Sequence, residues 1–190
     1  MTWGARAAIA AMVLCALTAP AAAQEGVFLT EEQAPHAVFP DATKVERHEI
    51  TASDPLQARL KADLGEAAMS IWEASYVFFD VWRGDARLGR AFLVDEIGKH
   101  RPITFVVGVR DDGHVQDVAV VAYREAYGGE IRNKRFLAQY HGKNAADALK
   151  PYQDITNIAG ATLSVEAAGR AVKKALALAR ETDGRSASAQ

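Results

Sequence analysis

With 190 residues, of which 49% are hydrophobic and 24% are charged, the chain is long enough for one well-packed domain and too short for two ordinary ones. Its formal net charge of −2 does not create the positive electrostatic potential that attracts nucleic acid, and the Lys and Arg residues are dispersed among acidic ones. We therefore exclude nucleic acid as a partner.

The N-terminus has the pattern of a secretory signal. Arg6 precedes an apolar run over residues 7–17, and three alanines at 21–23 offer small residues for cleavage before Gln24. The run is shorter than the ~20 apolar residues that a membrane span needs, although a retained N-terminal anchor is the alternative. We predict a signal peptide over residues 1–23.

The single cysteine, Cys15, lies inside this signal. The mature chain would then have no thiol, which excludes disulfides, cysteine-ligated iron–sulfur clusters and covalently attached c-type haem. The five histidines show neither His-x-x-x-His nor Glu-x-x-His spacing, so no metal site is predicted. Any redox function would need another cofactor.

The N-terminal half predicts two helices with a strand between them. The first helix is expected over residues 29–38, with Thr30 as its N-cap, and the strand over residues 43–51. The second helix is expected over residues 54–64, because Pro55 suits the first turn of a helix.

The middle of the chain predicts an antiparallel sheet made of hairpins. Residues 75–83 and 88–94 flank a Gly-Asp turn, and residues 103–109 and 115–123 flank an Asp-Asp-Gly turn. The run at 103–109 is almost continuously apolar, which is typical of a strand buried on both faces, so we place it at the centre. Strands in the middle with helices at both ends indicate an α+β fold with a single domain.

An amphipathic helix is predicted over residues 165–180, where apolar residues recur at steps of three or four. Ser164 is the expected N-cap. Thr162 then lies in the turn that enters the helix, where the helix dipole would stabilise an anion on its hydroxyl by roughly 0.3–1 kcal/mol. Gly160 permits the backbone conformation of such a turn. The small, polar tail at 182–190 is predicted to be disordered.

The segment before this helix resembles the flavin-attachment motif of the FMN-binding domain family, Asp-x-Ile-Ser-Gly-Ala-Thr-x-Ser/Thr. In that family the last Thr of Ser-Gly-Ala-Thr carries FMN through a phosphoester. Thr162 matches this acceptor, Gly160 and Ala161 match the residues before it, and Ser164 matches the following hydroxyl. The residues that carry the resemblance are Asp154-Ile155 and Ile158-Ala159-Gly160-Ala161-Thr162-Leu163-Ser164.

The resemblance covers roughly residues 75–179 and includes further blocks in the same order, at 98–105, 123–125 and 136–139. Many relatives have a Thr-Pro-Gly-Leu-Gly loop near the flavin ring, and residues 126–130 occupy its place here. The FMN-binding residues that the resemblance implies are Glu125, Tyr127, Gly128, Gly129, Gly160, Ala161, Thr162, Leu163 and Ser164.

The resemblance implies a periplasmic flavoprotein, with FMN covalently attached at Thr162 of a domain that spans residues 24–181. It also implies two partners: a FAD:protein FMN transferase that attaches the flavin, and a membrane-bound or periplasmic electron-transfer partner. The protein would be an electron-transfer protein or subunit more than a stand-alone enzyme. The alternative is a non-catalytic binding or sensory module that binds FMN non-covalently or not at all, because Thr156 and Ala159 stand where the family usually has Asp and Ser or Thr.

Two groups of residues allow both a functional and an ordinary interpretation. Arg132, Lys134 and Arg135 would pair with the FMN phosphate or remain solvated on a short helix. Gly128 and Gly129 would let the backbone approach a flavin ring or form an ordinary turn.

Overall fold

The computed structural model describes residues 26–65 and 69–188. The predicted signal peptide and the predicted start of the mature chain at Gln24 lie outside the described residues.

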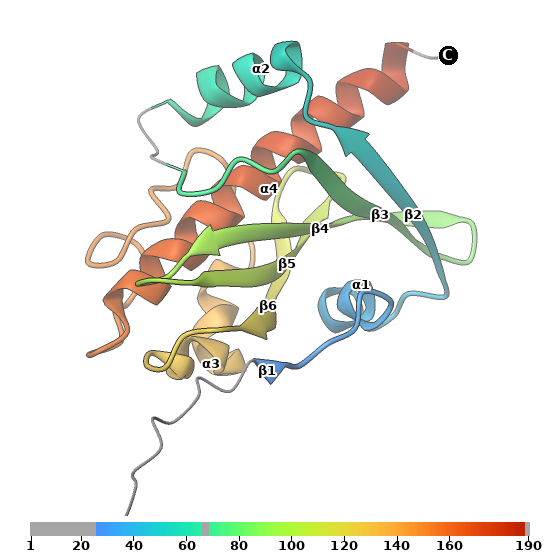
Figure 1. The fold of residues 1–190 in the computed structure, drawn as a ribbon. Helices are drawn as coiled ribbons and strands as arrows, with labels where there is room; N and C mark the ends of the chain where they lie inside the picture. Colours follow the sequence, from blue (N-terminus) through green and yellow to red (C-terminus); the bar gives the residue numbers. More distant parts are fainter. Residues whose placement is uncertain (1–25, 66–68, 189–190) are drawn as a thin grey trace, which may run out of the picture.

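A six-stranded sheet forms the centre of the domain, with the strand order β1-β6-β5-β4-β3-β2 (Figure 1). Every neighbouring pair is antiparallel. The predicted α+β fold with hairpin strands is therefore confirmed. The strands are β1 (Gly26–Val27), β2 (Lys44–Thr51), β3 (Ser75–Arg83), β4 (Ala86–Ile97), β5 (Pro102–Arg110) and β6 (Val115–Tyr123).

Both predicted hairpins are present, and β5 lies inside the sheet between β4 and β6 as its apolar composition indicated. The strand β4 continues to Ile97 and pairs with β5 along its length, so that a third hairpin turns at residues 98–101. The sequence does not predict this turn, because its residues lack a typical hairpin pair such as Asn-Gly.

Six helical elements accompany the sheet. The helix over Asp54–Leu64 has its predicted bounds, whereas the first helix begins at Gln33 instead of residue 29. None of the helices within the described residues has both the length and the apolar character needed to cross a membrane. The elements are α1 (Gln33–Val38), α2 (Asp54–Leu64), η1 (Gly129–Arg132), α3 (Lys134–Leu137), η2 (Ala138–Tyr140) and α4 (Thr162–Ser188).

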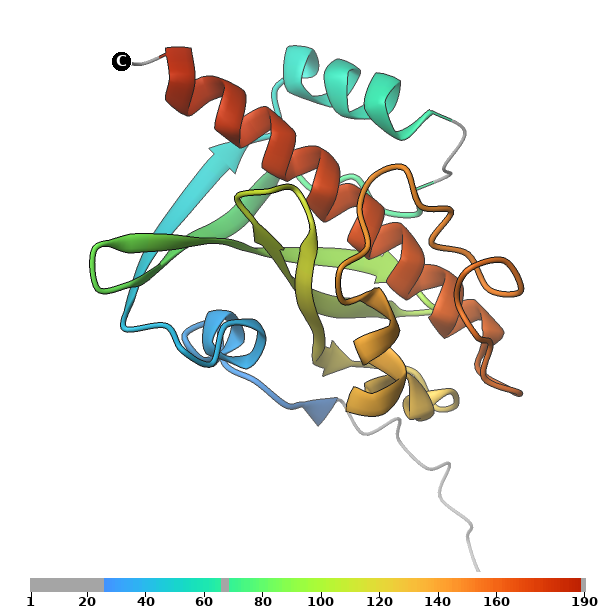
Figure 2. The ribbon, with the colours of Figure 1, turned by 180° about the vertical axis from the view of Figure 1, so that it is seen from behind.

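The long helix α4 crosses one face of the sheet, with α2 beside it, and α1 covers the opposite face (Figures 1 and 2). The larger core lies under α4, where alanines such as Ala168 and Ala171 pack with Phe105 and are fully buried. Small side chains let a helix lie close to a sheet, which explains the alanine-rich sequence of α4. A smaller core that includes Val38 and Val106 lies under α1.

The N-terminus of α4 differs from the prediction. The helix begins at Thr162, and the Val165 N–H donates to the Ala161 carbonyl at 3.0 Å, so Ala161 occupies the N-cap position. Ser164 is not the N-cap: it lies inside the first turn with only 4% of its surface exposed. The prediction was wrong because the Ser164 hydroxyl meets the Tyr123 hydroxyl at 3.2 Å instead of a backbone N–H.

The C-terminus of α4 also differs, because the helix continues to Ser188 through the tail that was predicted to be disordered. Thr182 is buried, and its hydroxyl donates within the helix to the carbonyls of Leu178 and Ala179, both at 2.9 Å. The buried Arg90 of β4 donates to the Thr182 hydroxyl and pairs with Asp183. These contacts with the sheet stabilise a helical turn whose small polar residues carry no apolar pattern.

A buried ionic network fixes α4 against β4. The Lys174 ammonium is fully buried and lies 2.8 Å from Glu96 Oε1 and 3.0 Å from Glu73 Oε2. Arg170 donates to the other Glu96 oxygen at 2.9 Å. Burial would raise the pKa of Glu96, but Lys174 and the hydrogen bonds to the carboxylate outweigh it and lower the pKa below its ordinary value. The network therefore sets the position of α4, which carries Thr162 at its first residue.

Candidate functional site

The Thr162 side chain is half-buried at the first residue of α4. The Asn157 amide nitrogen donates to Thr162 Oγ1 at 2.8 Å and to the Tyr152 hydroxyl at 2.6 Å. The Thr162 oxygen thus accepts one hydrogen bond and keeps its own hydrogen available for a base. Asn157 orients this hydroxyl.

The first turn of α4 provides a favourable environment for a negative charge. An α-helix leaves its first N–H groups without intrahelical partners, and its dipole is positive at this end. The first turn contains no acidic residue. Leu163 is 44% exposed, so this end of the helix is accessible from solvent. An anion attached to Thr162 would therefore be stabilised by the helix.

A tight turn over residues 158–161 leads into the helix. Gly160 has a φ of 82°, as the predicted turn requires, and a Cβ atom placed there would meet nothing within 4 Å. The Ala161 N–H donates to the Ile158 carbonyl at 3.0 Å. Ala159 is exposed, as is Thr156, whose N–H donates to Gln139 Oε1 at 2.8 Å. The two departures from the family motif therefore lie on the surface beside Thr162.

The loop after β6 contacts the same end of α4. Gly128 has a φ of 86°, and a Cβ atom there would lie 2.8 Å from Ser164 Oγ and 3.6 Å from the Ala161 Cα. The Tyr123 hydroxyl donates to the Tyr127 carbonyl and meets Ser164 Oγ at 3.2 Å. Burial raises the pKa of Tyr123, so its hydroxyl remains a donor at neutral pH. These contacts bring together Gly128, Ala161 and Ser164, three of the FMN-binding residues that the resemblance implies.

Exposed aromatic side chains lie on both loops that contact the start of α4. Tyr127, after β6, is 82% exposed, and Tyr152, before α4, is 79% exposed. Soluble proteins usually bury much of their aromatic side chains, so two exposed ones on these loops suit a flat apolar ligand. Tyr127, which the resemblance implies as a flavin contact, thus lies exposed on a loop that contacts the start of α4.

Glu125 supports the neighbouring turn between β4 and β5. Its Oε1 atom accepts backbone N–H groups of Lys99 at 2.6 Å, Arg101 at 2.8 Å and His100. Burial would raise the pKa of Glu125, but these N–H groups outweigh it and hold the pKa below its ordinary value. The carboxylate therefore stays ionised and fixes the turn at residues 98–101 beside the loop that holds Tyr127.

Comparison with known families identifies this region. Residues 98–177 match the family model described as FMN-binding domain. This segment is similar to FMN-binding domains. The match includes β5, β6, both site loops and the first half of α4, and thus every cofactor-binding residue predicted from the sequence. No match was found among curated proteins.

The residues around Thr162 have hydrogen-bonding groups and exposed aromatic side chains that fit a flavin nucleotide. The Asn157 Oδ1 atom is buried and has no hydrogen-bond partner among the described residues. A buried acceptor without a partner costs about 1–3 kcal/mol, and the ribityl hydroxyls of FMN are donors that would satisfy it. The helix N-terminus suits the phosphate, and the exposed Tyr127 and Tyr152 suit the ring.

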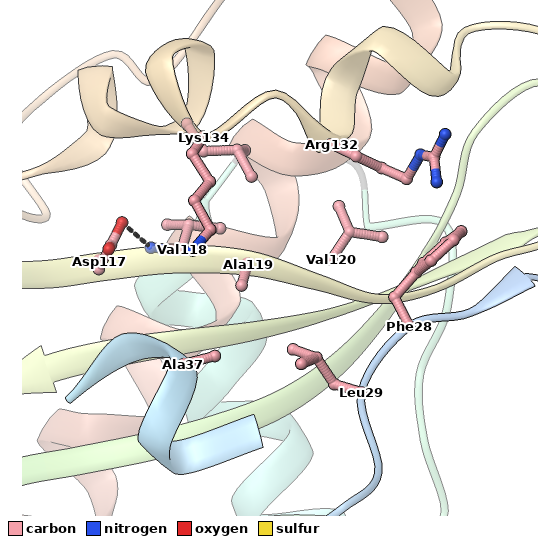
Figure 3. Close-up of a pocket in the computed structure, with 10 residues that line it drawn as sticks. Phe28, Leu29, Ala37, Asp117, Val118, Ala119, Val120, Arg132 and Lys134 are labelled. Carbon is pink, nitrogen blue, oxygen red and sulfur yellow. Dashed lines mark hydrogen bonds between the residues drawn. The ribbon is translucent and has the colours of Figure 1, made fainter. Parts of the chain in front are cut away.

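Two of the three cations considered for the FMN phosphate, Arg132 and Lys134, line a different cavity. Gly129 begins η1, and its carbonyl accepts a hydrogen bond from Arg132 Nε at 3.1 Å. Arg132 and Lys134 line a cavity beside β6 whose lining contains neither Thr162 nor the loop before it (Figure 3). Arg135 does not line this cavity.

Sequence reasoning missed three residues of this site: Tyr123, Tyr152 and Asn157. Asn157 and Tyr152 lie in the loop that the motif singled out, but no spacing pattern indicates which polar residue bonds the acceptor. Tyr123 ends a predicted strand, and only its contact with Ser164, 41 positions away, reveals its role.

Proposed function

We propose that this protein carries FMN as a phosphoester on Thr162 and relays electrons in the periplasm. The observation that carries the proposal is the Thr162 hydroxyl, which Asn157 orients at the N-terminus of α4 within the segment that is similar to FMN-binding domains. The first-turn N–H groups would face the phosphate charge, and no acidic side chain of that turn opposes it.

The attachment step follows from the chemistry of the hydroxyl. FAD is the donor, and the Thr162 oxygen attacks the phosphorus that belongs to its FMN half. The new bond joins Oγ1 to this phosphorus, the bond to the bridging oxygen breaks, and AMP leaves with that oxygen. The hydroxyl proton passes to a base or to solvent, and no electrons are transferred. A FAD:protein FMN transferase is the proposed catalyst.

Once attached, the flavin supplies one- and two-electron transfer, and the chain supplies attachment, orientation and electrostatics. Gly128 lets the loop after β6 lie against the start of α4. Tyr127, Tyr152 and Leu163 provide exposed apolar surface for the ring. Outside the cytoplasm a dissociated cofactor would be diluted, so a covalent tether maintains a high effective concentration.

Intact-mass measurement after co-expression with such a transferase tests the attachment. The wild type is expected to gain the mass of one FMN less one water, and Thr162→Ala is expected to gain nothing. Thr156→Ala is the matched control, since it removes an exposed Thr from the loop that precedes Thr162, and it should still be modified. An unmodified wild type, or a modified Thr162→Ala variant, would contradict the proposal.

Export and electron transfer require separate tests. We infer that residues 1–23 direct export, so the periplasmic fraction should contain a chain that begins at Gln24. Electron relay predicts that the flavin in this fraction is reversibly reduced and reoxidised by components of the membrane. Retention of the full-length chain in the cytoplasm would contradict the proposed location.

The surface position of Ala159 and Thr156 supports a second candidate function. Neither side chain has a hydrogen bond within the described part of the chain, so both are free to contact a modifying enzyme. If that enzyme requires the usual Ser and Asp, the domain is a binding or sensory module without covalent FMN. The double variant Thr156→Asp with Ala159→Ser should then become modified where the wild type is not. If neither form binds flavin, the module function is favoured.

A further inference from the structure

A second cavity lies at the outer edge of β6, apart from the flavin site. Its volume is about 280 Å³. Val118 and Val120 of β6 form part of its wall, and Phe28 and Leu29 approach from the segment between β1 and α1 (Figure 3). Arg132 and Lys134 complete it from the opposite side. Phe28 and Leu29 precede the matched family segment, so this cavity joins two parts of the chain that the family model does not cover together.

The cavity exists because β1 covers only a short part of the β6 edge. The strand β1 pairs with Ala122 and Tyr123, and the chain then turns away after Phe28 and Leu29 donate to the Val121 carbonyl. Residues 117–120 have no strand partner on this side within the described ranges.

The open edge of β6 at residues 117–120 is unsuited to pairing with an added peptide strand. The Asp117 carboxylate already accepts the Val118 N–H at 2.8 Å, as the dashed line in Figure 3 shows. A strand that paired here would have to displace this carboxylate, which is the kind of charge that protects sheet edges from pairing. The cavity therefore favours a compact ligand over an extended chain.

The charge of the cavity is positive. The Arg132 guanidinium lies 4.3 Å from the centre of the Phe28 ring, and its Nε donates to the Gly129 carbonyl at 3.1 Å. The Lys134 ammonium has no hydrogen bond or ion pair within the described part of the chain. Asp117 is the one carboxylate among the described residues of the lining, and it is engaged with Val118. Two cations thus stand over an apolar wall with no acidic partner.

We propose that this cavity binds a small organic anion, in which a carboxylate, sulfonate or phosphate is joined to an apolar or aromatic body. The anionic group would lie between Arg132 and Lys134, and the body would contact Val118, Val120 and the ring of Phe28. Cationic groups form charge-assisted hydrogen bonds with such anions, and the apolar wall adds burial. The site is independent of flavin attachment.

Naphthalene-2-carboxylate is a suitable probe, with 2-naphthylmethanol as a neutral probe of the same aromatic body. Both are titrated into the isotopically labelled protein, and binding is followed by the backbone amide signals in NMR spectra. We expect the carboxylate to shift the amides of Leu29, Val118, Ala119 and Val120 in a saturable way and to bind more tightly than the alcohol.

Charge variants separate the role of the two cations. The double variant Arg132→Gln with Lys134→Gln should lower the affinity for naphthalene-2-carboxylate by about fivefold or more. It should leave the affinity for the alcohol unchanged, since only the ionic contribution is removed. Arg135→Gln is the matched control: it removes a cation of α3, next to Lys134, that does not line the cavity, and should leave both affinities unchanged. All three side chains are exposed, so the spectra should keep the dispersion of a folded protein.

Several results would overturn the proposal. These are the absence of saturable shifts at residues 117–120, equal carboxylate affinity in the wild type and the double variant, and shifts centred on Gly128 and Leu163 at the flavin site. Broadening of the 117–120 signals with rising protein concentration, without any probe, would show instead that a second copy of the chain covers this edge.

Discussion

The side-chain amide nitrogen of Asn157 lies between two hydroxyl oxygens, 2.8 Å from that of Thr162 and 2.6 Å from that of Tyr152. The oxygen of the same amide is buried and has no partner within the described residues. Asn157 thus couples the proposed acceptor to an exposed aromatic side chain and retains a free acceptor for a ligand.

Replacing Asn157 with Ala should slow flavin attachment. Loss of a hydrogen bond worth about 0.5–1.5 kcal/mol would lower the rate by roughly twofold to tenfold, because the Thr162 hydroxyl is no longer oriented. The measurement is the rate of mass gain with the transferase and FAD. Tyr152→Phe is the control, because it removes the second hydrogen bond of the amide and keeps the bond to Thr162. An unchanged rate in the Ala variant would show that Asn157 does not orient the acceptor.

Replacing Gly160 with Val should reduce flavin occupancy more than Ala159→Ser increases it. A left-handed conformation costs a residue with a Cβ roughly 1–2 kcal/mol, and a β-branched residue more, so the turn that presents Thr162 would be distorted. Gly142→Val is a matched control, because Gly142 has a φ of 73° and, like Gly160, open space around it. It should lower the free energy of unfolding similarly without changing occupancy, measured by absorbance per protein. Equal occupancy in both variants would refute this role of the turn.

Replacing Glu96 with Gln should destabilise the fold in a pH-dependent way. The variant leaves the buried Lys174 with one carboxylate fewer, and breaking a buried pair costs about 3–5 kcal/mol at neutral pH. Urea unfolding at a series of pH values measures the difference. Glu46→Gln, which removes an exposed carboxylate that pairs with Lys44, should change stability little at any pH.

The direction of the pH effect follows from the pKa of Glu96. Its folded-state pKa lies below the ordinary value of 4.5, so its contribution is fully present above that value. The contribution is lost as the pH falls through the lower, folded-state pKa. The stability difference between the wild type and Glu96→Gln should therefore narrow below about pH 4.5. A difference that widened there would show that the carboxylate is not held ionised.

Replacing Gly169 with Ala should destabilise the protein although alanine is the better helix former. An added Cβ would lie 2.1 Å from the Leu149 carbonyl oxygen, a backbone atom that cannot move without the loop before α4. Overpacking of this kind costs about 1–3 kcal/mol, which exceeds the gain of about 1 kcal/mol in helix propensity. Thermal unfolding should show a lower midpoint, and the Asn157 signals in NMR spectra should shift. A higher unfolding midpoint would mean that the loop before α4 can shift to accommodate the added Cβ at little cost.

Much of the sheet could be predicted from the sequence because hairpins are local structures. The strands at 75–83, 103–109 and 115–123 are rich in apolar residues and lie next to turns with typical residues, so neighbouring positions contain the information. The short strand β1 could not be predicted, since its two residues are specified only by pairing with Ala122 and Tyr123.

The sequence by itself determined where the proposed acceptor lies: Gly160 and the pattern of α4 define a turn before a helix, and the motif indicates Thr162. The tertiary structure alone decided what surrounds that hydroxyl. Ser164 bonds Tyr123 across 41 positions, and Glu125 binds the turn at 98–101 from the loop after β6. Side-chain hydrogen bonds between distant segments depend on how α4 packs on the sheet, and no local pattern of residues encodes that packing.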